Sequence, residues 1–327
     1  MKMLGWAKLV IVCLVFGVVT VGVRVRGQEK KALDPAAWGA DHVGKPVPEF
    51  VHGDECLFCH RNTIGATWQN NAHGVTIRQR EDAPELTKLV AAQSDLAPIA
   101  KEIEYFLGSR HVVRFLKKDG YGKFTILNRQ TALGETAKTT GEGKPVWDKT
   151  RFGDRCAGCH TTGVDSTNKT FVAFGLDCYA CHGDVNLEHG NDTSLVLLSK
   201  KQRNNAKVIT SVCAQCHLRD AKSKSTGLPY PNNFVAGDNL FRDFVVDWKR
   251  ADDENLNAGD RHVWRNVRDV AVYGDESITC LSCHQVHGNT SFKHRRVLRA
   301  AICSECHEAD SFKTPKRYAV RSGLCEY

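Results

Sequence analysis

The chain has 327 residues, 25% of them charged, with a formal net charge of +8, and its length suits one large domain or two ordinary ones. Four of its positive charges (Lys2, Lys8, Arg24 and Arg26) lie within residues 1–27, so the remainder carries only +4. This balance gives little support to a nucleic-acid partner, although local patches can still steer a protein partner.

Residues 1–27 have the pattern of an export signal. An apolar run from Leu9 to Val23 follows a basic start, and residues 25–27 offer a cleavage site. Residues 4–23 also approach the length that spans a membrane, so an uncleaved N-terminal membrane anchor is the alternative. Either form predicts that the remainder of the chain is exported.

Twelve of the fourteen cysteines occur in one motif, Cys-x-x-Cys-His, which appears six times. This motif is typical of c-type haem attachment, because both thiols and the adjacent imidazole must reach one macrocycle. The cysteines expected to bind six covalent haem c groups are Cys56, Cys59, Cys156, Cys159, Cys178, Cys181, Cys213, Cys216, Cys280, Cys283, Cys303 and Cys306. The histidines expected to be the proximal iron ligands are His60, His160, His182, His217, His284 and His307.

Other chemistries use similar cysteine pairs. Zinc knuckles and thioredoxin-like sites contain Cys-x-x-Cys, but neither explains why histidine follows the second cysteine six times. Six haems leave about 50 residues for each, too few to bury every haem in its own core. We therefore expect a mainly α fold with long loops and one small β-hairpin, in which the haems form the core and folding depends on their attachment.

Residues 28–150 are expected to form an N-terminal module that carries the first motif. Residues 83–107 have a helical pattern that a proline interrupts, and residues 111–127 have a hairpin pattern around the turn Asp119-Gly120. Residues 134–150 are rich in Gly, Thr and Lys and predict a loop that ends the module.

Residues 151–327 carry the other five motifs and are expected to form a five-haem module. A polar helix is expected from about Leu195 to Val212, leading into the fourth motif. Residues 222–240 contain several Gly and Pro residues and predict an irregular connection. Residues 241–272 have a charged helical pattern.

The sixth coordination position of each iron also needs a ligand. The only methionines, Met1 and Met3, lie in the leader, which excludes His/Met ligation in the mature protein. Eight histidines remain outside the motifs, enough for bis-histidine ligation of most haems, which predicts low-potential, electron-carrying centres. They are His42, His52, His73, His111, His189, His262, His287 and His294.

Several of these histidines have two interpretations. His262 is either a distal ligand or a surface residue of the charged helix. His111 is a ligand or a strand residue, and His294 is a ligand or part of a solvated basic run. His42 and His52 lie before the first motif and are expected to face solvent.

Three blocks of sequence carry a family resemblance. Trp68–His73 places a tryptophan and an Asn-x-His element after the first motif. Cys156–Gly163 and Cys178–His189 form a pair of the type Cys-x-x-Cys-His-x-Thr-Gly … Cys-x-x-Cys-His-Gly … His, and Cys280–Gly288 reads Cys-x-x-Cys-His-x-x-His-Gly. In these blocks the chain resembles the multihaem cytochromes of the c-552/c-554 type, over roughly residues 50–310. It departs from their tetrahaem members in having six motifs.

The resemblance implies that His73, His189 and His287 are distal ligands. His287 lies too close to His284 in the sequence to serve the same haem easily, so we expect it to reach a neighbouring haem. Such cross-ligation would tie the haems together.

Two functions follow from these patterns. An electron-transfer protein relays electrons between a redox donor and acceptor through closely spaced, six-coordinate haems and needs no catalytic residue. A redox enzyme of the nitrite, hydroxylamine or tetrathionate class needs one open-faced haem beside a cationic or proton-donating pocket. Nitrite and tetrathionate reductases of this kind often replace the proximal His by Lys or Cys, whereas all six motifs here end in His. This favours the carrier.

Assembly and location complete the hypothesis. The protein is expected in the periplasm or otherwise exported, with membrane association through residues 4–23, within a membrane-bound redox complex, if the anchor is retained. A subunit of a haem filament or outer-membrane conduit is a third interpretation that differs mainly in assembly. Cys13 lies in the apolar run and Cys325 near the C-terminus, and both are expected to be bystanders.

Overall fold

The structure is a computed structural model that describes residues 42–48, 50, 52–108, 111–134, 137–199 and 205–288. These residues all belong to one compact unit of the chain, Ala32–Tyr327. The predicted leader (residues 1–27), Cys13, His294, the sixth motif at Cys303–His307 and Cys325 lie outside the described residues. The predicted boundary at residue 150 stays a prediction.

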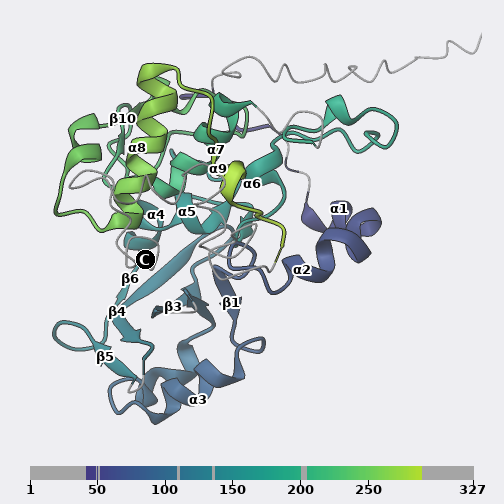
Figure 1. The fold of residues 1–327 in the computed structure, drawn as a ribbon. Helices are drawn as coiled ribbons and strands as arrows, with labels where there is room; N and C mark the ends of the chain where they lie inside the picture. Colours follow the sequence, from purple (N-terminus) through teal and green to yellow (C-terminus); the bar gives the residue numbers. More distant parts are fainter. Residues whose placement is uncertain are drawn as a thin grey trace, which may run out of the picture. The chain divides into compact units, whose positions relative to one another are not determined.

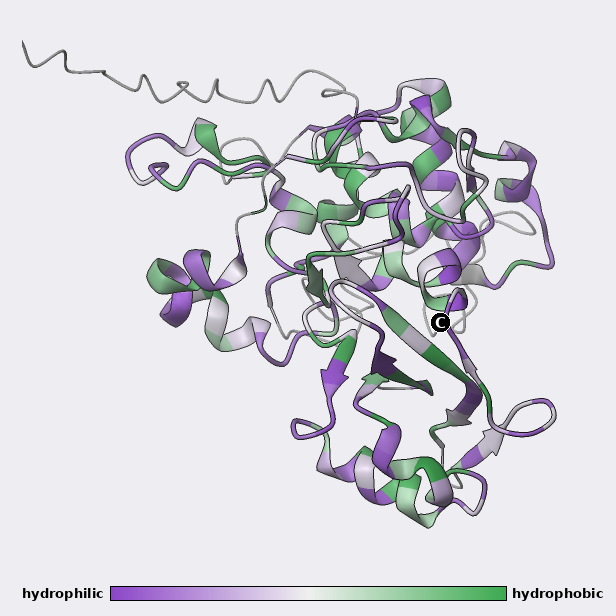
Figure 2. Ribbon diagram, turned by 180° about the vertical axis from the view of Figure 1, so that it is seen from behind, coloured by the Kyte–Doolittle hydropathy of each residue, from purple (hydrophilic) through white to green (hydrophobic). Residues whose placement is uncertain are grey.

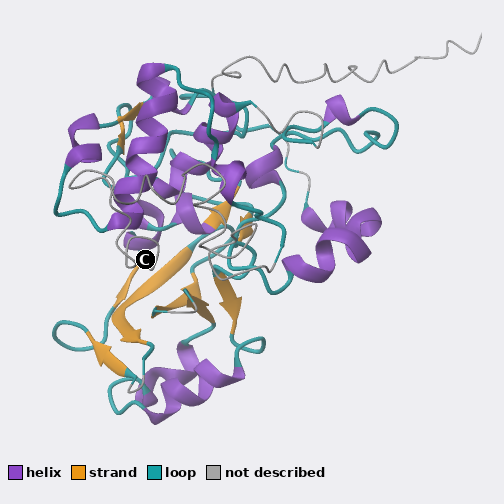
Figure 3. Cartoon of the chain, in the orientation of Figure 1, coloured by secondary structure: helices purple, strands orange, loops and turns teal. Residues whose placement is uncertain are grey.

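The N-terminal part of the described chain is built on a six-stranded antiparallel sheet (Figure 3). Its strands run in the order β1-β2-β3-β4-β5, and β6 also pairs with β4. The strands are β1 Ile77–Gln79, β2 Tyr105–Leu107, β3 Val112–Lys118, β4 Phe124–Ala132, β5 Lys138–Thr140 and β6 Trp147–Asp148.

The predicted hairpin is confirmed as β3 and β4, which pair in antiparallel register across the turn that contains Gly120. The expectation of only one small hairpin is wrong, however. Residues 134–150, expected to be a loop, supply β5 and β6, and residues 105–107, expected to be helical, form β2. Strands this short carry too little two-residue alternation to be recognised in the sequence.

Both faces of the sheet are buried. One face packs on α3 (Pro84–Ala92) and on the 3₁₀ turn η2 (Ala97–Glu102) through Phe106, Val113 and Phe115. Helix α3 carries both hydrophobic and hydrophilic residues (Figure 2), and its buried residues Leu86 and Val90 lie one turn apart, as expected of a helix with one buried face. The helical prediction for residues 83–107 is therefore confirmed for α3 and, as a 3₁₀ helix, for η2, and is wrong for residues 105–107, which form β2.

The opposite face of the sheet packs against the second motif. Tyr105, Leu116 and Phe124 share a hydrophobic cluster with Phe152 and Phe171. Phe152 belongs to α4 (Arg151–Arg155), which leads directly into α5 (Ala157–His160). The sheet thus supports one of the predicted haem-attachment motifs, although sheet and motif come from different predicted modules.

The rest of the described chain is mostly helical and irregular, and helix α7 packs against α8 and α9 (Figure 1). The remaining helices are α1 Gly53–His60, η1 Arg61–Gly65, α2 Ala66–Trp68, α6 Tyr179–His182, η3 Thr193–Leu195, α7 Ala206–His217, η4 Leu240–Arg242, η5 Trp248–Asp252, α8 Ala258–Tyr273 and α9 Cys280–Cys283. The remaining strands form two small sheets and are β7 Thr161–Thr162, β8 Ala173–Phe174, β9 Lys222–Ser223 and β10 Phe244–Val245.

The two longest helices have clear start signals. The side chain of Asn205 accepts a hydrogen bond from the Val208 N–H at the start of α7, and that of Asn257 accepts one from the Asp260 N–H at the start of α8. The helix predicted from Leu195 therefore begins later, at Ala206, and the charged pattern of residues 241–272 forms a helix only from Ala258. Among the described residues, none of the helices combines the length and the apolar composition that crossing a membrane requires.

Candidate haem sites

Five of the six motifs lie among the described residues, and each of them is placed at a helix end. Helices α1, α5, α6 and α7 end at the motif histidine, and α9 ends one residue before it. In a helical turn, side chains three and four positions apart share one face. The two thiols and the imidazole of each motif can therefore approach one macrocycle from the same side.

Three of these motif histidines are paired with a histidine from elsewhere in the chain. The ring centroids of His60 and His189 are 6.0 Å apart, and those of His182 and His287 are 5.9 Å apart. The rings of His73 and His217 form the third pair, with a centroid separation of 6.1 Å. Each pair joins one predicted proximal ligand to one predicted distal ligand.

These separations fit one metal atom between two imidazoles. A metal–imidazole bond is about 2 Å long, and each ring adds about 1 Å from its nitrogen to its centroid, so two rings on opposite sides of one metal have centroids about 6 Å apart. The interplanar angle varies from 8° for His60 and His189 to 80° for His73 and His217. Such variation is compatible with ligation because each ring can rotate about its bond to the metal.

Hydrogen bonds orient two of the paired rings. The Nδ1 of His182 is 2.6 Å from the carbonyl oxygen of Leu197, and the Nδ1 of His189 is 2.7 Å from that of Asn186. An Nδ1–H that donates to a carbonyl leaves Nε2 as the nitrogen available to a metal. These two histidines therefore have the backbone hydrogen bond at Nδ1 that metal-ligating histidines usually have.

Asn71 connects two of the predicted distal ligands. Its side chain is fully buried; its Oδ1 accepts a hydrogen bond from the His73 N–H at 2.9 Å, and its Nδ2 donates to the Val286 carbonyl at 2.6 Å. The Thr67 hydroxyl donates to the carbonyl of His287 at 2.6 Å. These bonds hold the segment around His287 against the turn that carries His73.

Thiols from different motifs are neighbours. Hydrogen bonding between Cys56 and Cys178 lowers the pKa of Cys56, and bonding with Cys213 lowers the pKa of Cys280. Contact with Cys216 lowers the pKa of Cys159 in the same way. The first motif therefore touches the third, and the fourth touches both the second and the fifth.

His262 lies on α8 near the fifth motif. Its side chain is exposed, and partial desolvation followed by the charge of the neighbouring His284 lowers its pKa. The structure thus brings the predicted distal candidate His262 close to a proximal histidine from another element.

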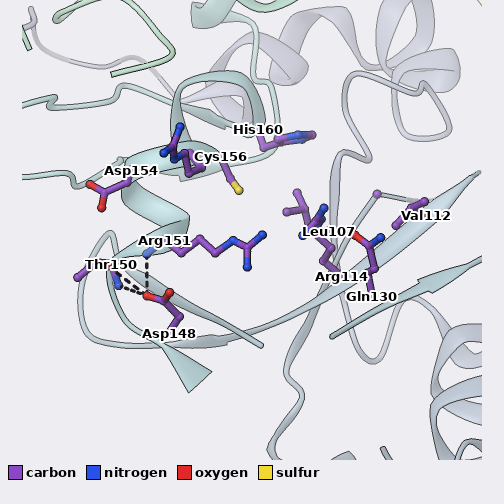
Figure 4. Close-up of a pocket in the computed structure, with 12 residues that line it drawn as sticks. Leu107, Val112, Arg114, Gln130, Asp148, Thr150, Arg151, Asp154, Cys156 and His160 are labelled. Carbon is purple, nitrogen blue, oxygen red and sulfur yellow. Dashed lines mark hydrogen bonds between the residues drawn. The ribbon is translucent and has the colours of Figure 1, made fainter. Parts of the chain in front are cut away.

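A cavity of about 890 Å³ lies beside the second motif (Figure 4). Cys156 and His160 line it, and the volume falls in the range of cavities that hold cofactors. Burial, with a contribution from the charge of Arg114, lowers the pKa of His160 to about 4. Its buried Nδ1 has no hydrogen-bond partner within the described chain. A neutral imidazole and a cavity of this size fit a haem attached at Cys156.

The opposite wall of this cavity carries residues that the sequence did not single out. Arg114 from β3 and Arg151 from α4 extend into the space that His160 and Cys156 face, and Gln130 from β4 lies across from Arg114 in the strand register (Figure 4). The only sequence signal for them is that the hairpin precedes the second motif in the chain.

The other histidines are placed differently. His111 is exposed at the start of β3, where its carbonyl accepts a hydrogen bond from the Leu133 N–H. His52 is exposed, as expected. The expectation that His42 faces solvent is wrong, because its Nδ1 lies 2.9 Å from the carboxylate of the buried Asp238.

Comparison with family models gives two matches. Residues 272–312 match a model described as a doubled CXXCH motif, and residues 118–183 match the model of cytochrome c554 and c-prime. Among solved structures, the undecahaem cytochrome from the S-layer of Carboxydothermus ferrireducens is similar, at 16% sequence identity and a TM-score of 0.47. The likeness covers 86% of this chain but 44% of that one, so the chain spans less than half of that protein's length. A search of curated proteins found no match.

The family matches fall on the haem-attachment motifs. One contains the second and third motifs, and the other contains the fifth and sixth. One description names the CXXCH motif itself and the other names c-type cytochromes, in agreement with the repeated Cys-x-x-Cys-His pattern and with covalently bound haem c. The chain is a multihaem c-type cytochrome.

Proposed function

We propose that this cytochrome is an exported electron carrier that binds six haem c groups and relays electrons through closely packed, mostly bis-histidine haems. Each bound haem supplies an iron that cycles between the ferric and ferrous states, and ligands, burial and hydrogen bonds set its potential. The chain provides the attachment thiols and both axial imidazoles. Its partners are a redox donor and a redox acceptor.

The observation that carries the proposal is the set of three histidine pairs. His60 with His189, His217 with His73 and His182 with His287 have centroid separations of 5.9–6.1 Å, which suit one iron between the rings of each pair. Two axial imidazoles occupy both faces of a haem, and such a haem exchanges electrons without binding a substrate. His262 beside His284 is proposed as a fourth pair.

The contacts between thiols supply an order for the relay. The first motif touches the third through Cys56 and Cys178, and the fourth touches the second and fifth. The pKa of Cys213 in the fourth motif is raised by its hydrogen bond with Cys280, by burial and, to a smaller extent, by the nearby Cys181 of the third motif. We therefore propose that the haems of motifs one, three and four are successive neighbours and that the haem of motif four also adjoins those of motifs two and five.

Haem stoichiometry tests the proposal first. Mass spectrometry of the purified protein is expected to show the mass of six haems on the polypeptide. A mass near that of the bare polypeptide would overturn the assignment, and fewer than six haems would correct the count.

Ligand variants test the histidine pairs. Replacing the distal imidazole in His189→Ala or His287→Ala is expected to convert one haem from low-spin to high-spin iron, as measured by electron paramagnetic resonance. His52→Ala is the matched control, because His52 is exposed and its ring contacts Phe50 rather than another histidine. Unchanged spectra in both distal variants would refute the pairs.

The cavity beside His160 favours a second candidate function, a redox enzyme with one open-faced haem. Apart from His160, the described residues that line this cavity include no histidine, methionine or lysine, and they include three arginines. A catalytic haem of the nitrite or hydroxylamine class needs a cationic pocket of this kind. A large high-spin signal in the unmodified protein, with turnover of such a substrate, would favour the enzyme over the carrier.

A further inference from the structure

We infer that the arginine-lined side of the cavity beside His160 binds a small inorganic oxyanion next to the haem proposed there, and that Arg114 and Arg151 recognise this anion. The inference rests on the proposed attachment of a haem at the second motif and adds a ligand class and two recognition residues to it. The argument depends on the charges that face this cavity and on how they are paired.

The described lining of the cavity carries three arginines against two carboxylates. The lining includes Asp148 and Asp154 as well as the arginines. The Oδ1 of Asp148 accepts hydrogen bonds from the N–H groups of Thr150 and Arg151, at 2.9 Å and 3.0 Å, and from the Thr150 hydroxyl at 3.1 Å. Asp154 forms an ion pair with Lys169. Asp154 therefore already has a cationic partner, whereas Asp148 keeps its negative charge, and the backbone hydrogen bonds, with a contribution from the charge of Arg151, lower the pKa of Asp148.

Neither Arg114 nor Arg151 forms an ion pair within 4 Å of a described carboxylate, although the charge of Arg151 adds to the backbone hydrogen bonds that lower the pKa of the neighbouring Asp148. Figure 4 shows both side chains extending into the cavity from different elements, β3 and α4. A guanidinium presents a planar fork of donors that matches the oxygens of an anion. Two such forks that line one cavity from different elements favour a small oxyanion over a neutral ligand.

The pairing of β3 with β4 sets the position of Arg114. Arg114 is paired in register with Gln130, next to the irregularity between Arg114 and Leu116, where β3 and β4 shift register. Irregularities of this kind often re-aim a side chain next to a functional site. Gln130 also lines the cavity and offers an amide donor beside Arg114.

The experiment compares an anionic and a neutral ligand of the same site in the holoprotein. Nitrite binding to the ferric protein and carbon monoxide binding to the reduced protein are titrated by optical spectroscopy. In Arg114→Gln the nitrite affinity is expected to fall about ten- to hundredfold, the loss typical of hydrogen bonds to a charged group. Carbon monoxide affinity is expected to stay within about twofold, because this ligand carries no charge to lose an interaction with the guanidinium.

Three further variants complete the design. Arg151→Gln is expected to show the same selective loss of nitrite affinity. Because Arg151 is exposed on α4, this variant leaves the sheet unaltered and serves as the test if Arg114→Gln does not fold. Arg114→Lys is expected to restore part of the nitrite affinity. Arg78→Gln is the matched control, because it removes the same charge from another strand of the sheet, where Arg78 pairs with Glu85 outside the cavity lining.

Specific outcomes overturn the inference. The arginine variants could lose nitrite and carbon monoxide affinity equally, or could shift the reduction potential without changing the ratio of the two affinities. Either result would show that the arginines bind the haem propionates instead of an oxyanion. Failure of the wild-type haem to bind either ligand, with a high-spin conversion in His111→Ala, would make His111 its sixth ligand. If peptide mass spectrometry finds no haem on Cys156 and Cys159, the proposed function fails at this motif. That result differs from finding a haem there that binds no anion, which overturns only the present inference.

Discussion

At the scale of single residues, Asn71 holds two predicted ligands in place. Both ends of its fully buried amide are satisfied, one by the His73 backbone and one by the Val286 carbonyl beside His287. A buried amide with two such contacts is costly to remove, because each partner is left without its hydrogen bond. Its position in an Asn-x-His element gives the sequence signal.

Asn71→Ala is therefore expected to lower the free energy of unfolding by about 1–3 kcal/mol, the cost of unsatisfied buried groups. It is also expected to raise the high-spin fraction at the haems that His73 and His287 serve. Denaturant unfolding and electron paramagnetic resonance measure the two effects. Asn70→Ala, at an exposed neighbouring position, is the control and should change neither. A stable variant with wild-type spectra would show that Asn71 does not position these ligands.

A second residue-scale prediction concerns His42. Its ring joins the segment before the first motif to Asp238, whose pKa burial raises. In His42→Ala the Asp238 carboxylate keeps the Val235 N–H as a donor but loses the imidazole. The free energy of unfolding of His42→Ala is expected to fall by about 1–3 kcal/mol. That of His52→Ala should stay within about 0.5 kcal/mol of wild type. Equal stability of the two variants would contradict the structural role of His42.

At the scale of elements, the turn between β3 and β4 docks against the chain near the second motif. Gly122 has a φ of +62°, and a Cβ there would lie 2.4 Å from the carbonyl oxygen of Phe171. The Phe171 N–H also donates to the Gly122 carbonyl at 3.0 Å. The glycine therefore permits both the left-handed backbone and the close approach.

Gly122→Ala is expected to destabilise the protein by about 1–3 kcal/mol, the usual cost of a strained backbone position. It is also expected to perturb the cavity between the sheet and the second motif. Thermal unfolding and the spectrum of the second haem report the two effects. Gly134→Ala is the control, because no atom lies within 4 Å of the added Cβ. Similar stability in both variants would show that the turn does not dock as described.

The sequence predicted elements where a pattern was long enough to read. The hairpin of β3 and β4 has strands of seven and nine residues and was correctly predicted, whereas β5 and β6, with three and two residues, were taken for a loop. Helix α3 was found, but its predicted continuation is interrupted at Gln93 and ends in β2. Short strands are defined by their partners rather than by their own sequence.

At the scale of the whole molecule, the motifs themselves could be predicted but not their partners. Cys-x-x-Cys-His is local, so the sequence alone places the thiols and one axial ligand of each site. The ring pairs join residues far apart in the chain, such as His60 and His189, and depend on how the loops after α2, α6 and α9 return to the motifs. Arg114 and Arg151 were missed for the same reason, because only the packing of the sheet against α4 brings them to one cavity.

The proposed arrangement also predicts that folding depends on the haems. The described hydrophobic clusters lie in the sheet and around α7 and α8, whereas the described motif histidines and thiols around them are partly buried or exposed. Protein made without haem attachment is expected to lose cooperative unfolding in that region while the sheet retains some protection in hydrogen exchange. A haem-free chain with native protection throughout would contradict this dependence.

The most direct test of the central claim is the position of the irons in a crystal of the holoprotein, located by anomalous diffraction at the iron edge. We expect six irons, three of them between His60 and His189, between His73 and His217, and between His182 and His287. Irons bound by the motif histidines with these partners turned away, or no iron at the motifs, would contradict it.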